Sequence, residues 1–348
     1  ENAWKHHEAA NNRHQMAVTA FLRAWALYEA HQPRRAMSEL DRAARICDEL
    51  GYRRFLRPYG AGAREMLEYA AVRKVAEPLL AAVSEEQKAR RATKKSEAAA
   101  SDMVPAVRAF ALGRGSVLVG ERQVSDLEWR SEKSKEMFFY LLHRQEPVSK
   151  EEIFAALWPD LPESKCNSNF HSSLYRLRRA LFHECVVRDN NGAYALNPKG
   201  VFTSDVEAFN AAMFEADVAK DEDARAAKLE EAVALYKGQF LASTYSEWVE
   251  PLRRELEDRY IEALNELGAR RLREGRHEES LQLFRALEAV DTYSEAAAYG
   301  IMRAHVAMND GGSAVRHYRR FKQLLKDDLD EDPTERLTAV YREASSRA

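Results

Sequence analysis

Residues 165–179 hold the side chains best suited to bind an anionic surface. These fifteen residues include four cations and no aspartate or glutamate, a local charge of +4. On a helix at about 100° per residue, one face carries Lys165, Ser168, Ser172, Tyr175, Arg176 and Arg179, and Asn169 and Arg178 flank it. Arg can donate two hydrogen bonds to guanine, Asn can do the same to adenine, and Lys or Arg binds phosphate. These residue types therefore predict contact with double-stranded DNA.

A solvated outer face on a core helix is the competing interpretation. Such faces mix Glu with Lys and Arg, because oppositely charged i,i+4 pairs stabilise a helix. This face has one sign of charge. The other side carries Phe170, Leu174, Leu177 and Leu181, which cluster within about 60° and would be buried. We therefore predict a helix over 164–183 that packs on a core and offers its acid-free side to a DNA groove.

The flanking segments predict how this helix is held. Apolar periodicity indicates a helix at 131–144, and Ser149 with Glu152 three residues later forms a capping box for a helix at 149–157. Asn-Asn-Gly between two β-prone runs predicts a hairpin after residue 185. Helix, helix, turn, helix, hairpin is the winged helix-turn-helix order. Arg188, Asn190 and Asn191 are then further DNA-contact candidates, with plain turn chemistry an equal alternative.

The segments upstream differ in composition. Residues 107–125 alternate apolar residues with glycine breaks, which predicts short strands in a small sheet. Residues 84–103 carry almost no large apolar side chain and are interpreted as a linker. A helical pair is predicted at 20–30 and 34–50 with a turn at His31 to Pro33, and a third helix at about 61–83. Small and apolar residues occupy tetratricopeptide-like positions in the pair, namely Ala20, Ala24, Leu27, Ala36, Leu40 and Ala43.

Residues 203–348 predict a second helical domain with an internal repeat of period 34. Leu267, Leu272, Gly275, Leu281, Phe284 and Leu287 recur as Ile301, Val306, Asn309, Val315, Tyr318 and Phe321. Thirty-four residues is the tetratricopeptide period, and Gly275 and Asn309 fall at the turn positions. This domain holds 21 Lys and Arg against 30 Asp and Glu, a net charge of −9. A basic segment beside an acidic domain suits a DNA contact attached to a module that stays off DNA.

Other chemistry is not indicated. The sequence has no phosphate-loop or zinc-protease motif, and Gly113 and Gly115 are better explained as a hairpin turn. His6 and His7 lack a second ligand cluster, and the three cysteines lack metal or disulfide spacing. No apolar run is long enough to span a bilayer, and residues 1–20 lack a signal peptide's apolar region. We therefore expect a cytoplasmic protein that is no enzyme and needs no cofactor or metal.

Two segments resemble known families. Residues 107–197 resemble the winged-helix domain of OmpR-type response regulators, in the version found in the antibiotic regulatory protein family of transcription activators. VSKEEIFAALWPD (148–160), the Leu-Tyr-Arg-Leu-Arg-Arg-Ala-Leu core (174–181) and Gly-Ala-Tyr (192–194) carry this resemblance. Residues 203–345 resemble the bacterial transcriptional activation domain, on YKGQFL (236–241), Trp248, Arg253, Arg254 and the segments that start at Asp291 and His317. Residues 1–83 resemble sensor repeats of large ATPase-linked activators similar to the maltose regulator, in which an ATPase domain lies upstream.

The resemblance implies a sequence-specific transcription regulator, an activator, that contacts promoter DNA. The implied contact residues are Asn169, Ser172, Arg176 and Arg178, with Lys165 and Arg179 nearby. The loop Pro159 to Ser164 would face RNA polymerase, and the repeat domain would serve dimerisation, effector sensing or polymerase contact. The alternative is a protein-interaction scaffold in which the winged helix docks protein.

The predicted fold is mainly α, with helical repeats and a winged helix-turn-helix that has a small N-terminal sheet and a C-terminal hairpin wing. The predicted domains are 1–83, 104–200 and 203–348, with the linker at 84–103. The chain would then be a fragment of a longer ATPase-linked regulator.

Overall fold

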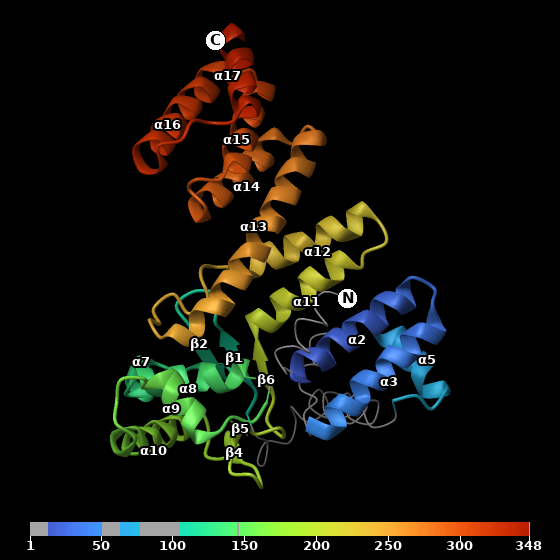
Figure 1. Ribbon diagram of the computed structural model, residues 1–348, viewed down its shortest axis with the longest axis vertical. Helices are drawn as coiled ribbons and strands as arrows, with labels where there is room; N and C mark the ends of the chain where they lie inside the picture. Colours follow the sequence, from blue (N-terminus) through green and yellow to red (C-terminus); the bar gives the residue numbers. More distant parts are fainter. Residues whose placement is uncertain (1–12, 51–62, 77–104, 145, 348) are drawn as a thin grey trace. The chain divides into compact units, whose positions relative to one another are not determined.

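The computed structural model describes residues 13–50, 63–76, 105–144 and 146–347, which are mainly helical (Figure 1). The chain divides into two compact units, residues 1–211 with 241–249, and residues 212–240 with 250–348. We call residues 105–211 with 241–249 the winged-helix unit and the second group the repeat unit. The predicted fold class is confirmed, whereas His6, His7 and the predicted linker at 84–103 lie outside the described residues.

The N-terminal helices are α2 (Arg13–Glu29), α3 (Pro33–Leu50) and α5 (Arg64–Val72). The predicted helical pair is confirmed, because α2 and α3 pack through small side chains that are fully buried, among them Ala20, Ala24 and Ala36. His31 has a φ of 57° at the turn between them. The third helix ends at Val72, earlier than predicted, where the chain turns through Lys74 and Ala76 with positive φ.

A four-stranded sheet opens the winged-helix unit. Its strands are β1 (Val107–Phe110), β2 (Ser116–Val119), β3 (Arg122–Gln123) and β6 (Phe202–Ser204), in the order β3-β2-β1-β6. The first three strands are antiparallel neighbours, as 107–125 predicted. The edge strand β6 was not predicted, since it has three residues and no readable periodicity. It pairs parallel to β1, with Val107 opposite Phe202.

The predicted winged helix follows the sheet. It consists of α7 (Asp126–Trp129), α8 (Glu132–His143), α9 (Lys150–Leu157), α10 (Glu163–Ala180), and the hairpin strands β4 (Val186–Arg188) and β5 (Tyr194–Leu196). The short helix α7 was missed, and α10 ends three residues earlier than predicted. Leu181 leaves helical geometry, with φ −98° and ψ −85°. The capping box of Ser149 and Glu152 is confirmed, and the hydrogen bonds from Ser149 hold the pKa of Glu152 below its usual range.

The predicted buried side of α10 is confirmed. Phe170 is fully buried, and its ring lies 4.8 Å from Tyr194 of the wing and 5.9 Å from Phe154 of α9 in edge-on contacts. Leu174, Leu177 and Leu181 continue the buried row. Burial of each such side chain contributes about 1.5–3 kcal/mol, and the edge-on ring geometry fixes the rotation of α10. The opposite side of the helix is therefore held toward solvent.

Residues 241–249, which we call the strap, belong to the winged-helix unit although helices of the repeat unit precede and follow them in sequence. The backbone N–H groups of Leu241 and Ala242 donate to the carbonyls of Ala111 and Gly113 at 2.8 and 2.7 Å. Farther along, Trp248 Nε1 donates to the buried carboxylate of Glu136 at 2.8 Å. The indole also meets the Tyr140 ring edge-on at 5.1 Å. The strap thus binds the backbone just after β1 and packs its tryptophan on α8.

The second helical region contains α11 (Asp205–Asp217), α12 (Glu222–Leu235), α13 (Glu250–Arg273), α14 (His277–Val290), α15 (Glu295–Ala307), α16 (Gly311–Leu329) and α17 (Glu335–Arg347). The predicted turn positions are confirmed, because Gly275 and Asn309 both have positive φ, 76° and 58°. A Cβ at Gly300 would lie 2.2 Å from the Phe284 ring, so glycine is required there for the helices to approach. None of the described helices has the length and apolar content to span a bilayer.

Candidate nucleic-acid interface

The start and end of α10 are both fixed by neighbouring elements. Pro162 precedes the first helical residue and accepts the backbone N–H groups of Lys165 and Cys166. At the other end, Arg122 Nη2 of β3 donates to the carbonyl of Ala180 at 3.2 Å. A cation there satisfies an unpaired carbonyl and complements the negative end of the helix dipole. Arg122 gave no signal in the sequence, because its partner lies 58 residues away.

Most of the predicted contact residues lie on the outer face of α10. Lys165, Ser172, Tyr175 and Arg179 are exposed, and Asn169 and Arg176 are half-buried. In the described part of the chain, none of the salt bridges involves a cation of α10. Each cation on this face therefore keeps its hydrogen-bond donors available for an anion. The structure brings these six residues together as the wheel predicted.

Arg178 is the exception among the predicted contact residues of α10. Its side chain is half-buried, and Nη2 donates to the backbone carbonyl of Val186 at 2.9 Å. This hydrogen bond ties the recognition face to the first strand of the wing. In this structure Arg178 therefore positions the wing relative to α10, and its guanidinium group is already engaged.

The wing combines turn chemistry with exposed amides. The Asp189 carboxylate accepts the backbone N–H groups of Asn191 and Ala193, and Gly192 has a φ of 88°. Arg188 Nε donates to the Gly192 carbonyl at 3.1 Å, and its guanidinium lies over the Tyr194 ring. Turn chemistry accounts for these bonds. The side chain of Asn191 is exposed and remains a candidate contact, as does that of Asn190.

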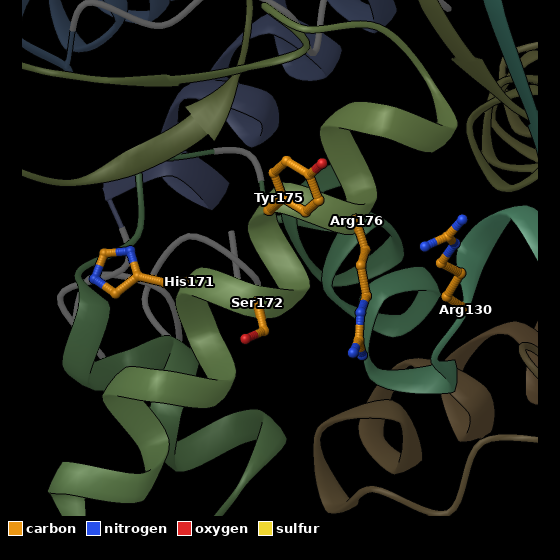
Figure 2. A pocket seen from close by; sticks show the side chains of 5 residues that line it. All are labelled: Arg130, His171, Ser172, Tyr175 and Arg176. Atoms are coloured by element: carbon orange, nitrogen blue, oxygen red, sulfur yellow. The ribbon is translucent and has the colours of Figure 1, made fainter.

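A hollow of about 460 Å³ lies beside α10 and is lined by Arg130, His171, Ser172, Tyr175 and Arg176 (Figure 2). Two of these, Arg130 and His171, were not among the predicted contact residues. Arg130 follows α7 and is exposed, so a second element adds a cation to the face. His171 Nε2 lies 3.4 Å from Lys150 Nζ of α9. Sequence periodicity could not find Arg130, since it lies between helices.

The arrangement offers hydrogen-bond donors and positive charge, which suit phosphate oxygens and the edges of bases. The described residues contain no group of three His, Cys, Asp or Glu placed to hold a metal ion. Among the described residues of α10, Tyr175 is the one large hydrophobic side chain that is exposed, at 63%. The face therefore resembles a nucleic-acid contact surface more than an apolar protein-docking groove.

Comparisons with known proteins agree with this fold. Residues 204–344 match the family described as the bacterial transcriptional activator domain, which supports a bacterial transcriptional activator. A solved structure of Mycobacterium tuberculosis EmbR, in complex with a low-affinity phosphopeptide, is similar with a TM-score of 0.54 and 20% sequence identity. The similarity covers 71% of this chain and 66% of that chain, and at this identity it concerns the fold. No curated protein matches the sequence. The resemblance of residues 107–197 to OmpR-type domains stays a prediction.

Proposed function

We propose that this protein is a sequence-specific regulator of transcription, an activator, that places α10 in the major groove of promoter DNA. The acid-free face of α10 carries the proposal. Lys165, Arg176 and Arg179 lack carboxylate partners among the described residues, and the small side chains of Asn169 and Ser172 let the helix approach base edges. Arg188 and Asn191 of the wing would contact the DNA backbone or the minor groove.

The regulatory part of the proposal concerns two other surfaces. The segment from Pro159 to Ser164, whose last two residues begin α10, is exposed throughout and is proposed to face RNA polymerase. The repeat domain, with its net charge of −9, is proposed to serve dimerisation, effector sensing or polymerase contact in the cytoplasm. Its negative charge disfavours binding to DNA, which leaves the basic face of α10 as the DNA-contacting surface.

The protein-scaffold alternative makes a different demand on α10. A helix that docks protein through an apolar groove presents exposed Leu, Phe or Met at its centre. The exposed face of α10 has none of these, and its large exposed side chain is Tyr175. This observation favours DNA over a protein partner.

The test is selection of duplexes from a random pool, followed by gel-shift titration at several salt concentrations. Arg176→Ala is expected to abolish specific binding while leaving the circular dichroism spectrum and the melting temperature unchanged, because Arg176 makes no hydrogen bond or ion pair with the described residues. Affinity should fall steeply with salt as counterions are released. Unchanged affinity in the variant, or binding without salt dependence, would contradict the proposal.

A further inference from the structure

The hollow beside α10 gathers two guanidinium groups from different elements. Arg176 comes from the C-terminal half of α10, and Arg130 comes from the junction between α7 and α8 (Figure 2). Neither makes an ion pair with any described residue. Two cations beside one hollow repel each other, and a bound anion between them removes that cost. Ser172 and Tyr175 line the same hollow, so small and aromatic side chains of α10 complete its wall.

The backbone at Arg130 is strained. Arg130 has φ 56° and ψ −3°, in the left-handed region that favours glycine or asparagine, and it forms the C-cap of α7. An L-residue with a long side chain costs free energy there relative to glycine. A strained residue at a solvent-facing hollow is better explained by what its side chain binds than by the stability it gives.

Arg130 also stands outside the helix that enters the groove. When a recognition helix lies in the major groove, its neighbouring elements meet the phosphate backbone that borders the groove. If α10 lies in the groove, a hollow shared by such an element and the side of α10 would be at the position of a phosphate, whereas base edges would face the centre of the helix.

We propose that Arg130 and Arg176 bind one phosphodiester group of the DNA backbone at the hollow that Ser172 and Tyr175 also line. This inference rests on the proposed function and specifies it further. Arg130 becomes a DNA-contact residue that sequence reasoning did not find. Arg176 becomes a residue that sets the register of α10 on the duplex, and base recognition passes to Asn169 and its neighbours toward the start of the helix.

The experiment uses the full chain and the duplex of highest affinity that the wild-type chain selects from a random pool. Single phosphates of that duplex are replaced one at a time by neutral methylphosphonates, and affinities are measured for the wild type and four variants, Arg130→Gln, Arg130→Gly, Arg176→Gln and Arg114→Gln. Arg114 is an exposed arginine of the same unit that does not line the hollow, so it controls for the loss of one charge.

We expect Arg130→Gln to bind about tenfold more weakly than wild type at low salt. The slope of log affinity against log salt should fall by about 0.9, the value for one lost phosphate contact. One methylphosphonate position should weaken the wild type and have no further effect on Arg130→Gln. Arg130→Gly should lose the same affinity while its melting temperature stays equal or rises, because the backbone strain is relieved.

Three outcomes distinguish a failure of the phosphate site from a failure of the proposed DNA-binding function. If the wild type selects no duplex, the proposed function fails. If the wild type binds and Arg176→Gln weakens binding while Arg130→Gln matches Arg114→Gln, regulation through DNA stands and the phosphate site is wrong. The site is also wrong if Arg130→Gln weakens binding by changing the preference at one base pair, while every methylphosphonate position weakens the variant as much as it weakens the wild type.

Discussion

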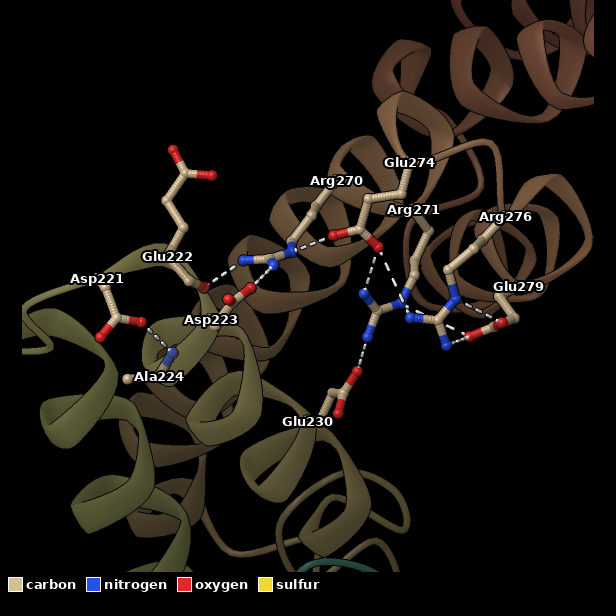
Figure 3. A network of polar contacts seen from close by, with 10 residues as sticks. All are labelled: Asp221, Glu222, Asp223, Ala224, Glu230, Arg270, Arg271, Glu274, Arg276 and Glu279. Atoms are coloured by element: carbon tan, nitrogen blue, oxygen red, sulfur yellow. Dashed lines mark hydrogen bonds and ion pairs between the residues drawn. The ribbon is translucent and has the colours of Figure 1, made fainter.

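The arginines at the junction of α13 and α14 differ from those of α10 in what surrounds them. At the junction each guanidinium meets carboxylates (Figure 3). Arg270 Nε donates to Glu274 at 2.6 Å, and Arg271 Nη1 donates to the same carboxylate at 2.8 Å. Arg276 Nε donates to Glu279 at 2.7 Å. The hydrogen bonds from Arg270 and Arg271 hold the pKa of Glu274 below its usual range.

The α10 face has the same residue type without partners. Arg176 and Arg179 have no carboxylate within ion-pair distance among the residues described, although both units are rich in charge. A paired arginine stabilises the fold, and a phosphate would have to displace its carboxylate. An unpaired one leaves its donors to water and can exchange water for phosphate with release of counterions. The difference indicates that the pairing of charges, more than their number, marks the surface that contacts DNA.

Introducing a carboxylate on α10 would pair one of its arginines, as at the α13–α14 junction, and should give the largest loss of DNA affinity. Ser172→Glu places an acid four residues before Arg176, where it can form an i,i+4 pair. The pair neutralises Arg176 and sets a negative charge against the DNA backbone. We expect affinity for the selected duplex to fall by about 100-fold, or about 2.7 kcal/mol, while helix stability stays equal or rises by about 0.3–0.5 kcal/mol.

The matched control is Ser172→Gln, which has the length of the glutamate without its charge. It should lose only a few-fold in affinity. Gel-shift titration gives the affinities, and thermal unfolding gives the stability. Equal losses in the two variants would mean that size at position 172, and not charge, limits binding, and the contrast between the two regions would no longer explain function.

Removing a paired arginine from the repeat unit should lower the stability of that unit and leave DNA affinity unchanged. Arg271 is 7% exposed and its guanidinium contacts Glu230, Glu274 and Glu279. Arg271→Met keeps the apolar stem and removes the charge, which leaves three carboxylates to repel one another. Because two of them are about half exposed, we expect a loss of about 2 kcal/mol in the free energy of unfolding, which is less than the roughly 3–5 kcal/mol for breaking a fully buried pair.

Urea unfolding followed by far-ultraviolet circular dichroism measures this loss, and none of the five tryptophans lies in the repeat unit. Tryptophan fluorescence therefore follows the other unit separately. The exposed Arg273→Met on the same helix is the control and should cost little. DNA affinity should stay within about twofold of wild type. A large loss of affinity in folded Arg271→Met would show that paired cations also take part in binding.

Sequence reasoning predicted the elements whose signals are local. Apolar periodicity gave the helices of the winged helix, and Asn-Asn-Gly gave the hairpin. The recurrence of six positions after 34 residues gave the repeat, and its turn positions Gly275 and Asn309 both have a positive φ. Helix ends were less exact, because the pattern cannot show where Leu181 turns out of helical geometry.

The features that were missed depend on distant parts of the chain. Strand β6 pairs with β1 although the whole winged helix lies between them in sequence, and the strap belongs to a different unit from the helices that flank it in sequence. A helical wheel gives the angle of Arg178 but not the Val186 carbonyl that its guanidinium reaches. Arg130 carries no periodic signal, so its place beside α10 follows only from packing.

The smallest effect that we expect is a loss of stability in the repeat unit, and not in the winged-helix unit, when the pH is lowered. His317 of α16 is buried, and its Nε2 has no hydrogen-bond partner among the described residues. Burial, followed by the positive charge of Arg320 and the neighbouring His305, lowers the pKa of His317 to about 4, although Glu288 at 3.6 Å opposes the shift. Burial likewise lowers the pKa of His305.

The sign of the effect follows from proton binding. An unfolded histidine has a pKa of about 6.5, so between about pH 6.5 and pH 4 the unfolded chain binds a proton that folded His317 does not. The contribution of neutral His317 to the free energy of unfolding is therefore fully present above about pH 6.5 and is lost progressively as the pH falls toward 4. Between pH 7 and pH 5 we expect the repeat unit to lose about 1–2 kcal/mol from this group.

Urea unfolding of wild type and His317→Gln at pH 7, 6 and 5 measures how steeply the free energy of unfolding changes with pH in each protein. The variant cannot titrate at this position, so its circular dichroism transition should depend less on pH, whatever its absolute stability. The transition seen by tryptophan fluorescence should be the same in both proteins, because position 317 lies in the repeat unit. Parallel pH dependences in the circular dichroism transition would mean that folding leaves the pKa of His317 unshifted, because the attraction of Glu288 balances burial. A wild type that gains stability relative to the variant as the pH falls would mean that Glu288 outweighs burial.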